Sequence, residues 1–124
     1  MKILIVDDSG MARMFIQRCL EAIGFSEAEF VEAENGQEAW SEIDVCPVDL
    51  VVSDLTMPVM DGEALLKKIK SDARYGELPV VIISSACNQA RQEELENDGA
   101  LAVLSKPFTP ADLYKTLQEF IQEG

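Results

Sequence analysis

Histidine is absent from the 124 residues of this chain, and its absence limits the chemistry that the protein can perform alone. Without an imidazole the chain has no histidine general base and no histidine metal ligand, and it cannot form a phosphohistidine. Any imidazole in the mechanism must therefore come from a partner.

Cysteine is scarce as well. The three cysteines, Cys19, Cys46 and Cys87, form no Cys-x-x-Cys pair and leave an odd number. This pattern excludes a disulfide framework and argues against a zinc site. We interpret all three as small apolar side chains.

Basic residues are few, and long apolar runs are missing. Ten Lys and Arg stand against 23 Asp and Glu, for a formal net charge of −13. Such a surface repels nucleic acid and anionic membranes. No apolar run approaches the ~18–20 residues of a membrane span, and the first run ends at Asp7-Asp8, too early for a signal peptide. We therefore expect a cytoplasmic protein that binds neither nucleic acid nor a membrane.

The sequence does contain a regular alternation of short apolar runs with amphipathic stretches. Continuous runs indicate strands buried on both faces, and apolar residues three and four positions apart indicate helices. We predict strands at 3–6, 30–31, 50–52, 80–83 and 101–104, and helices at 10–23, 36–44, 61–69, 88–98 and 109–121.

Strict alternation of strand and helix predicts an α/β fold. The expected architecture is a flavodoxin-like (βα)5 three-layer sandwich with a five-stranded parallel sheet in the order 2-1-3-4-5. The short second strand, flanked by Glu29 and Glu32, is expected at a sheet edge. Candidate N-caps and capping boxes support the helix starts, at Ser9, Asn35 with Glu38, Asp61, and Thr109 with Asp112, and Gly24 and Gly99 favour helix ends.

Polar side chains follow four of the strands at the carboxyl edge of the predicted sheet, where open α/β sheets bind ligands. They are Asp7 and Asp8, Asp54, Ser84 and Ser85, and Lys106. Two carboxylates about 4 Å apart repel by on the order of 4 kcal/mol at an effective dielectric constant of about 20, so three together need a cation. Their hard oxygens suit Mg²⁺, which leaves coordination positions for phosphate.

These residue types predict phosphoryl transfer to an aspartate. A metal ion between Asp8 and Asp54 would hold one phosphoryl oxygen while a free Asp54 oxygen attacks phosphorus. Lys106 would neutralise further charge, and the hydroxyl of Ser84 would donate a hydrogen bond to another phosphoryl oxygen. Asp54 is thus the predicted nucleophile.

The same residues resemble the receiver-domain signature of the two-component response-regulator family. The matching segments are Asp7-Asp8, Asp54-Leu55-Thr56-Met57-Pro58 with Asp61-Gly62, Ser84, and Lys106-Pro107-Phe108. Their spacing also resembles that of the family, and the resemblance covers essentially the whole chain. It implies one receiver domain over residues 1–124.

The resemblance implies a metal site and a phosphoacceptor. In it, Asp54 accepts the phosphoryl group, and Asp8, Asp54 and the main-chain carbonyl of Thr56 bind Mg²⁺, with Mn²⁺ as a substitute. Asp7 acts through metal-bound water.

The resemblance also implies contacts to the phosphoryl group. Lys106 contacts that group and precedes a cis bond to Pro107, and Ser84 is the switch hydroxyl. The family often has a switch aromatic three residues before the lysine. Here that residue is Val103, so no ring rotation reports phosphorylation in this chain.

The partners implied are a histidine kinase or a histidine-containing phosphotransfer protein, which donates the phosphoryl group, and a downstream protein target. We expect a monomer that catalyses its own phosphorylation and slow dephosphorylation and is not a multiple-turnover enzyme. The helix at 88–98 has only Ala90 and Leu95 as apolar anchors, so it should open easily. We expect this helix, the strand at 101–104 and the last helix, with Leu113, Leu117, Phe120 and Ile121 buried, to form the output face.

Three other functions remain alternatives. A Mg²⁺-dependent phosphatase with an aspartyl nucleophile usually has a second acid two residues later, where this chain has Thr56. A flavin-binding module would bring a phosphate against Asp7-Asp8, which repel it. A degenerate receiver used only for docking would not need the full acidic and basic set. Ordinary structural roles also stay open, such as helix capping for Asp7-Asp8 and a local hydrogen bond for Ser84.

Overall fold

The computed structural model describes residues 1–86 and 88–123, with side chains in the last helix described as far as residue 118. The strands are β1 (Lys2–Val6), β2 (Glu29–Ala33), β3 (Leu50–Asp54), β4 (Val80–Ser84) and β5 (Ala102–Ser105). The helical segments are α1 (Gly10–Leu20), η1 (Glu21–Phe25), α2 (Gly36–Val45), α3 (Gly62–Ser71), α4 (Gln89–Asn97) and α5 (Pro110–Glu123). Cys87, interpreted as a small apolar residue, and the side chains of Phe120 and Ile121, predicted to be buried, lie outside the described residues.

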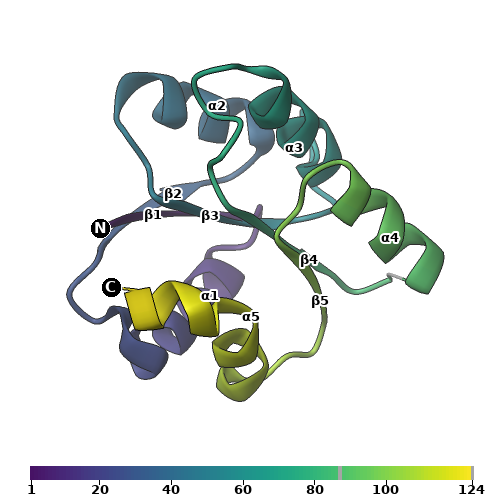
Figure 1. Cartoon of the computed structure of the whole chain (residues 1–124). Helices are drawn as coiled ribbons and strands as arrows, with labels where there is room; N and C mark the ends of the chain where they lie inside the picture. The colour runs from purple at the N-terminus through teal and green to yellow at the C-terminus, as the bar shows by residue number, and fades with distance from the viewer. Residues whose placement is uncertain (87, 124) are drawn as a thin grey trace.

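The five strands form one parallel sheet in the order β2-β1-β3-β4-β5, which confirms the predicted fold class and topology. Figure 1 shows α1 and α5 on one face of the sheet and α2, α3 and α4 on the other. No helix in the described part of the chain is long and apolar enough to cross a membrane.

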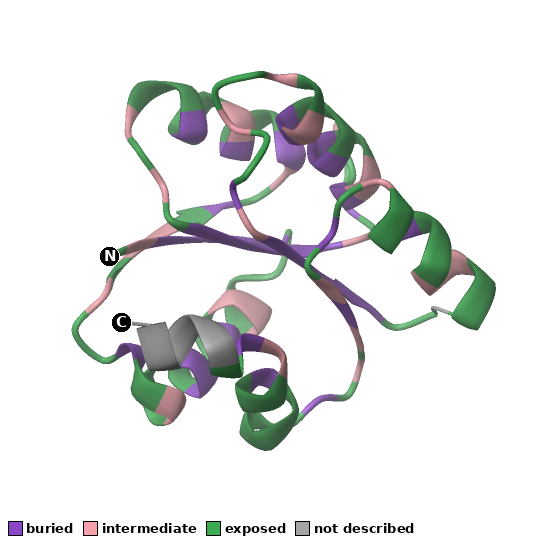
Figure 2. Ribbon diagram, viewed as in Figure 1, coloured by how far each residue is buried: buried purple, intermediate pink, exposed green. Residues whose placement is uncertain are grey.

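Each face of the sheet carries its own apolar core. One core joins the sheet to α1 and α5 through residues such as Ile16 and Leu113, and the other joins it to α2, α3 and α4 through residues such as Leu65. The three interior strands contribute to both cores and are buried along nearly their whole length (Figure 2). These strands therefore give the carboxyl edge of the sheet a rigid base.

Several predicted boundaries need correction. Strand β2 spans five residues instead of two, with Glu29 and Glu32 exposed at the sheet edge as expected. Strand β5 begins one residue later than predicted, because Leu101 is 48% exposed and the paired residues start at Ala102. The first α-helix ends at Leu20 and continues as the π-helical segment η1, in which Gly24 adopts a φ of 128°.

The predicted caps form the expected hydrogen bonds. The side chain of Asn35 accepts from the Glu38 amide at 2.9 Å, and the side chain of Asp61 accepts from the Ala64 amide at 2.9 Å. Ser9 caps α1, and Thr109 and Asp112 form a reciprocal capping box at the start of α5. Local sequence thus determines where these helices begin.

Helix α4 is held less firmly than predicted. Leu95 is fully buried, but Ala90 is exposed, so the expectation of two apolar anchors was wrong. Ala90 is the second residue of α4 and lies at the exposed start of the helix, ahead of the turn that carries Leu95. A single buried side chain fixes α4 to the apolar interior, and polar contacts must supply the rest.

Candidate phosphoryl-transfer site

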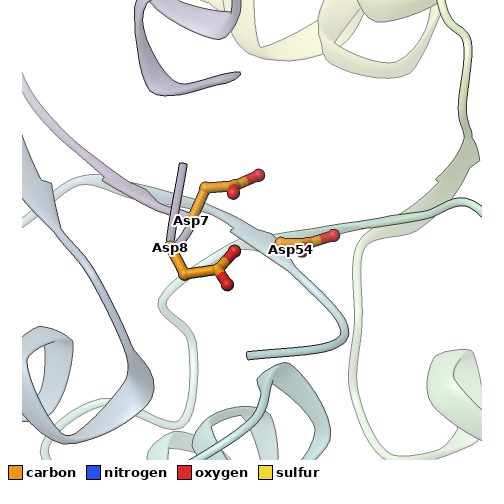
Figure 3. Close-up of side chains that lie close together, drawn as sticks. All are labelled: Asp7, Asp8 and Asp54. Carbon is orange, nitrogen blue, oxygen red and sulfur yellow. The ribbon is translucent and has the colours of Figure 1, made fainter. Parts of the chain in front are cut away.

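Three aspartates meet at the carboxyl ends of β1 and β3 (Figure 3). The register pairs Val6 with Ser53, so Asp7 comes alongside Asp54. One carboxylate oxygen from each of Asp7, Asp8 and Asp54 lies within 4.8 Å of the others. The structure therefore brings together the three acids that the sequence placed on this edge.

The three acids differ in their surroundings. Asp7 is 2% exposed and Asp54 8%, whereas Asp8 is exposed. The Oδ1 atom of Asp7 accepts a hydrogen bond from the Ser9 amide at 2.9 Å. Its Oδ2 atom is buried and accepts no hydrogen bond from any described residue. A buried carboxylate oxygen in this condition is unfavourable unless a cation or water completes its coordination.

Lys106 brings a positive charge into direct contact with two of these acids. Its Nζ atom lies 3.1 Å from Asp54 Oδ1 and 3.6 Å from Asp7 Oδ2. The Lys106 amide donates to the Ser84 carbonyl at 2.8 Å, and the bond to Pro107 is cis, as predicted. The lysine thus reaches the acids from a main chain that is hydrogen-bonded to β4.

The electrostatics of Asp54 and Lys106 follow from burial and from each other. Burial raises the pKa of Asp54, and the charge of Asp7 raises it further, although the hydrogen bond from Lys106 opposes both. Burial alone would lower the pKa of Lys106, but the hydrogen bond and charge of Asp54, aided by Asp7, raise it above its ordinary value. Lys106 therefore remains a cation at neutral pH.

This set of side chains fits Mg²⁺. Three carboxylates and one ammonium group leave two negative charges, which one divalent cation balances. The ligands are hard oxygens, and Asp7 Oδ2 is buried without a hydrogen-bond donor among the described residues. Mg²⁺ prefers such oxygens and usually binds through one or two carboxylates while keeping other positions for water or phosphate. Asp7, Asp8 and Asp54 are the residues that could hold it.

Two other predicted residues lie close by in the fold without contacting the acids. Ser84 is 4% exposed, and its hydroxyl oxygen accepts from the Ala86 amide at 3.2 Å. Among the described residues no hydrogen bond joins the hydroxyl group of Ser84 to Asp54 or to Lys106, so its hydroxyl hydrogen stays available to a ligand. Thr56 lies in the loop after β3 with its side chain exposed. The role of its carbonyl as a metal ligand stays a prediction.

Sequence reasoning missed two glycines whose missing side chains shape the loop between β3 and α3. A Cβ atom on Gly62 would overlap the Asp54 carbonyl oxygen, and one on Gly36 would lie 2.7 Å from the Met60 carbonyl oxygen. The amides of both glycines donate to this loop at 2.8 Å, Gly62 to Leu55 and Gly36 to Met60. The loop therefore packs closely against the start of both helices. The Asp61-Gly62 pair was the signal available for this.

An apolar groove beside the acids was also missed. It has a volume of about 560 Å³ and is lined by Met11, Phe15 and Phe108 together with Lys106 and Ser85. Phe15 is 48% exposed and meets Phe108 edge-on, with ring centroids 5.4 Å apart. The available signal was that Met11 and Phe15 are four residues apart and fall outside the apolar face predicted for this helix.

Comparisons with known proteins agree with this geometry. Residues 3–118 match the model of the response regulator receiver domain. The chain is 35% identical to the chemotaxis protein CheY1 of Helicobacter pylori over 119 residues, which cover 95% of this chain and 94% of that protein. The solved structure of the chemotaxis response regulator CheY4 of Vibrio cholerae superposes with a TM-score of 0.83 at 31% identity, covering 95% of this chain and 96% of that one. The signal receiver domain of a DNA-binding response regulator from Colwellia psychrerythraea gives a TM-score of 0.88 at 26% identity and covers 98% of both chains.

The crowding of the three acids leads to a first prediction. At about 5 Å two carboxylates repel by roughly 1 kcal/mol even in a water-like dielectric. We expect Asp8→Asn to raise the free energy of unfolding by about 1 kcal/mol in metal-free buffer and to reduce the stabilisation that added Mg²⁺ provides. Urea denaturation with and without Mg²⁺ measures both effects. The control is Glu27→Gln, which removes a charge from the exposed turn before β2, and equal responses of the two variants would contradict the prediction.

Proposed function

Because the chain belongs to the response regulator receiver domain family of two-component signalling, we propose that it is a switch in which Asp54 accepts a phosphoryl group from a phosphohistidine of a partner protein. The observation that carries the proposal is the cluster of Asp7, Asp8 and Asp54, with the ammonium group of Lys106 beside two of the three, Asp54 and Asp7. Phosphoryl transfer depends mainly on positioning and on charge neutralisation, and these four side chains can supply both.

In the proposed reaction an Asp54 oxygen attacks phosphorus, the bond from phosphorus to the donor imidazole nitrogen breaks, and an acyl phosphate forms on Asp54. Asp8 and Asp54, joined by the Thr56 carbonyl, would hold Mg²⁺ or Mn²⁺, with Asp7 acting through a metal-bound water. When bound, the ion would neutralise charge on the phosphoryl oxygens.

The residues around Asp54 position the group and neutralise its charge. Lys106 exchanges part of its contact with Asp54 for a phosphoryl oxygen, which its 3.1 Å position allows with little movement. Ser84 donates its free hydroxyl hydrogen to another phosphoryl oxygen. Because neither step needs a general acid, side-chain placement supplies most of the catalysis.

We also propose that the protein is not a multiple-turnover phosphatase. Position 56, two residues after the nucleophile, carries Thr56, which cannot serve as a general acid. The acyl phosphate would therefore last until water attacks it slowly. Free thiols at Cys19 and Cys46 suit a reducing compartment, which supports the expectation of a cytoplasmic protein. We propose a monomer.

A second prediction tests the phosphoacceptor. Acetyl phosphate with Mg²⁺ should add the mass of one phosphoryl group to the intact protein, and the group should be lost in hydroxylamine, which cleaves acyl phosphates. Asp54→Asn should gain no mass, whereas the control Asp49→Asn, an acid just before β3, should behave like the wild type. Mass gain in Asp54→Asn, or sustained hydrolysis of phosphate esters by the wild type, would overturn the proposal.

The apolar groove beside Lys106 fits the proposed phosphodonor. Since the chain has no histidine, the donor imidazole must arrive on another protein and must approach Asp54 past Lys106. The groove continues directly from Lys106 and exposes Met11 and Phe15, which are 83% and 48% exposed. We propose that a helix of the histidine-containing partner lies in this groove.

A third prediction separates docking from chemistry. Phe15→Ser should slow phosphotransfer from a phosphorylated histidine-containing protein by about tenfold, as expected when an interface loses a buried aromatic anchor. Its phosphorylation by acetyl phosphate should match the wild type, because a small donor needs no docking surface. Tyr114→Ser, which removes an exposed aromatic residue from α5, is the control. Equal loss with both donors would assign Phe15 a structural role instead.

We propose that α4, β5 and α5 form the output face, and the structure supplies a connection from the site to α4. Arg91 of α4 lies 2.7 Å from Glu63, which is in the first turn of α3. That turn begins at Gly62, next to the Asp54 carbonyl. The arrangement links the main chain at Asp54 to a helix with one buried apolar anchor. The related proteins include a chemotaxis protein and a DNA-binding response regulator, so the similarity does not identify a target for this chain. We therefore propose an output surface and not a specific target protein.

A fourth prediction tests this link. The neighbouring Arg91 lowers the pKa of Glu63 below its ordinary value of 4.5, so the ion pair is fully formed above about pH 4.5 and is lost as the pH falls through the lowered value. Glu63→Gln at pH 7 should therefore increase hydrogen exchange in α4 by a few fold, in keeping with the ~0.2–1 kcal/mol of a surface ion pair. Lys67→Gln removes the weaker partner of Glu63, at 3.8 Å, and should leave α4 unchanged. Unaltered exchange in Glu63→Gln would contradict the link.

A further inference from the structure

Of the two basic residues of α1, Arg13 is the one whose side chain is hydrogen-bonded to the main chain of Asp7. Its Nη1 atom donates to the Asp7 carbonyl oxygen at 2.6 Å, a short hydrogen bond from a charged donor. Its Nε atom lies 2.8 Å from Glu32 Oε1, on β2. The Arg13 side chain is only 14% exposed. The guanidinium group thus spans from α1 across the end of β1 to the edge strand.

The contact fixes the peptide that joins the first two acids. The Asp7 amide already donates to the Ala33 carbonyl at 3.1 Å, and Asp7 Oδ1 is held by the Ser9 amide. The bond from Arg13 adds the missing restraint, because it holds the carbonyl of the Asp7–Asp8 peptide. In the part of the chain that the structure describes, the exposed Asp8 side chain accepts no hydrogen bond, so the orientation of that peptide sets the main chain from which its carboxylate extends.

We propose that Arg13 is a positioning residue for the metal site and that Glu32 holds it in place. Arg13 touches no reacting atom. It sets the direction of the Asp7–Asp8 peptide so that the carboxylates of Asp7 and Asp8 face Asp54 before a cation arrives. The inference rests on the proposed Mg²⁺-dependent function. The planar fork of arginine suits this task, because two of its nitrogens bind separate acceptors in fixed directions.

The sign of the effect distinguishes positioning from simple electrostatics. If Arg13 acted only through its charge, removing it would make the site more negative and would tighten the binding of a divalent cation. If Arg13 orients the ligands, removing it must weaken binding despite the gain in negative charge. Residues that orient metal ligands from outside the coordination shell typically change metal affinity by about 10- to 100-fold when mutated.

The test is isothermal titration calorimetry, in which Mg²⁺ is titrated into the full chain at fixed ionic strength. It compares the wild type, Arg13→Gln and Arg18→Gln. Arg18 lies on the same helix, is exposed and has the same charge. We expect Arg13→Gln to bind Mg²⁺ about tenfold more weakly than the wild type and Arg18→Gln to bind it equally well. Urea denaturation without metal checks that both variants are folded. Binding by Arg13→Gln as tight as the wild type, or tighter, would overturn the inference.

A second pair of variants serves if Arg13→Gln does not fold. Glu32→Gln keeps Arg13 but replaces its charged partner with a neutral one, which weakens the charge-assisted hydrogen bond. Glu29→Gln makes the same change of charge on the same strand. We expect weaker Mg²⁺ binding in Glu32→Gln than in Glu29→Gln, and equal affinities would overturn the inference. A wild type that binds no Mg²⁺ would instead overturn the proposed function, and the inference would fall with it.

Discussion

The repulsion among three carboxylates is the constraint on which this structure depends. Their mutual repulsion at the ends of β1 and β3 opposes folding by a few kcal/mol, and Lys106, a single positive charge, offsets only part of it. The interior strands offset this cost, because each fully buried Leu, Ile or Val contributes about 1.5–3 kcal/mol and β1, β3 and β4 supply many such residues. The hydrophobic core therefore holds the acids at separations they would not adopt on their own. A site of this kind is ready for a divalent cation and gains stability when one binds.

The main chain around the acids is held as closely as the acids themselves. Helix α3 begins so near to the Asp54 carbonyl that only glycine fits at position 62. The loop before it closes through a hydrogen bond from the Met60 amide to the Pro58 carbonyl, which leaves Val59 with a φ of 68°. This region is unfavourable for a β-branched residue, and such strain persists only where surrounding contacts enforce it. Because this loop packs so closely, a shift of the main chain at Asp54 would also displace the start of α3.

Much of the fold could be predicted from the sequence because its signals are local. Continuous apolar runs gave the strands, capping residues such as Asn35 and Asp61 gave the helix starts, and strand-end residues gave the acids and Lys106. What the sequence did not predict depends on pairs that are distant along the chain or on packing. Arg13 and Glu32 are 19 positions apart, and Arg91 and Glu63 are 28 apart. The periodicity of apolar residues does not predict such a pair, because each of the two residues on its own is typical of a charged residue on a solvated surface. The prediction that Ala90 would be an apolar anchor was wrong because its burial depends on how the helix packs, which the sequence pattern does not show.

The strands that carry the acids are buried on both faces, whereas α4 has one buried side chain, and the proposed switch would use this contrast. Helix α4 has one buried apolar side chain and an ion pair to α3, and surface ion pairs contribute only about 0.2–1 kcal/mol. The free energy that favours the present position of α4 is therefore small, and one or two new hydrogen bonds could favour a different position. A phosphoryl group on Asp54 would add charge next to Lys106 and Ser84, whose strand β4 leads directly toward α4. Because the acids and their strands are held by the core, the proposed switch would respond to that charge in the element with the fewest buried anchors, which is α4.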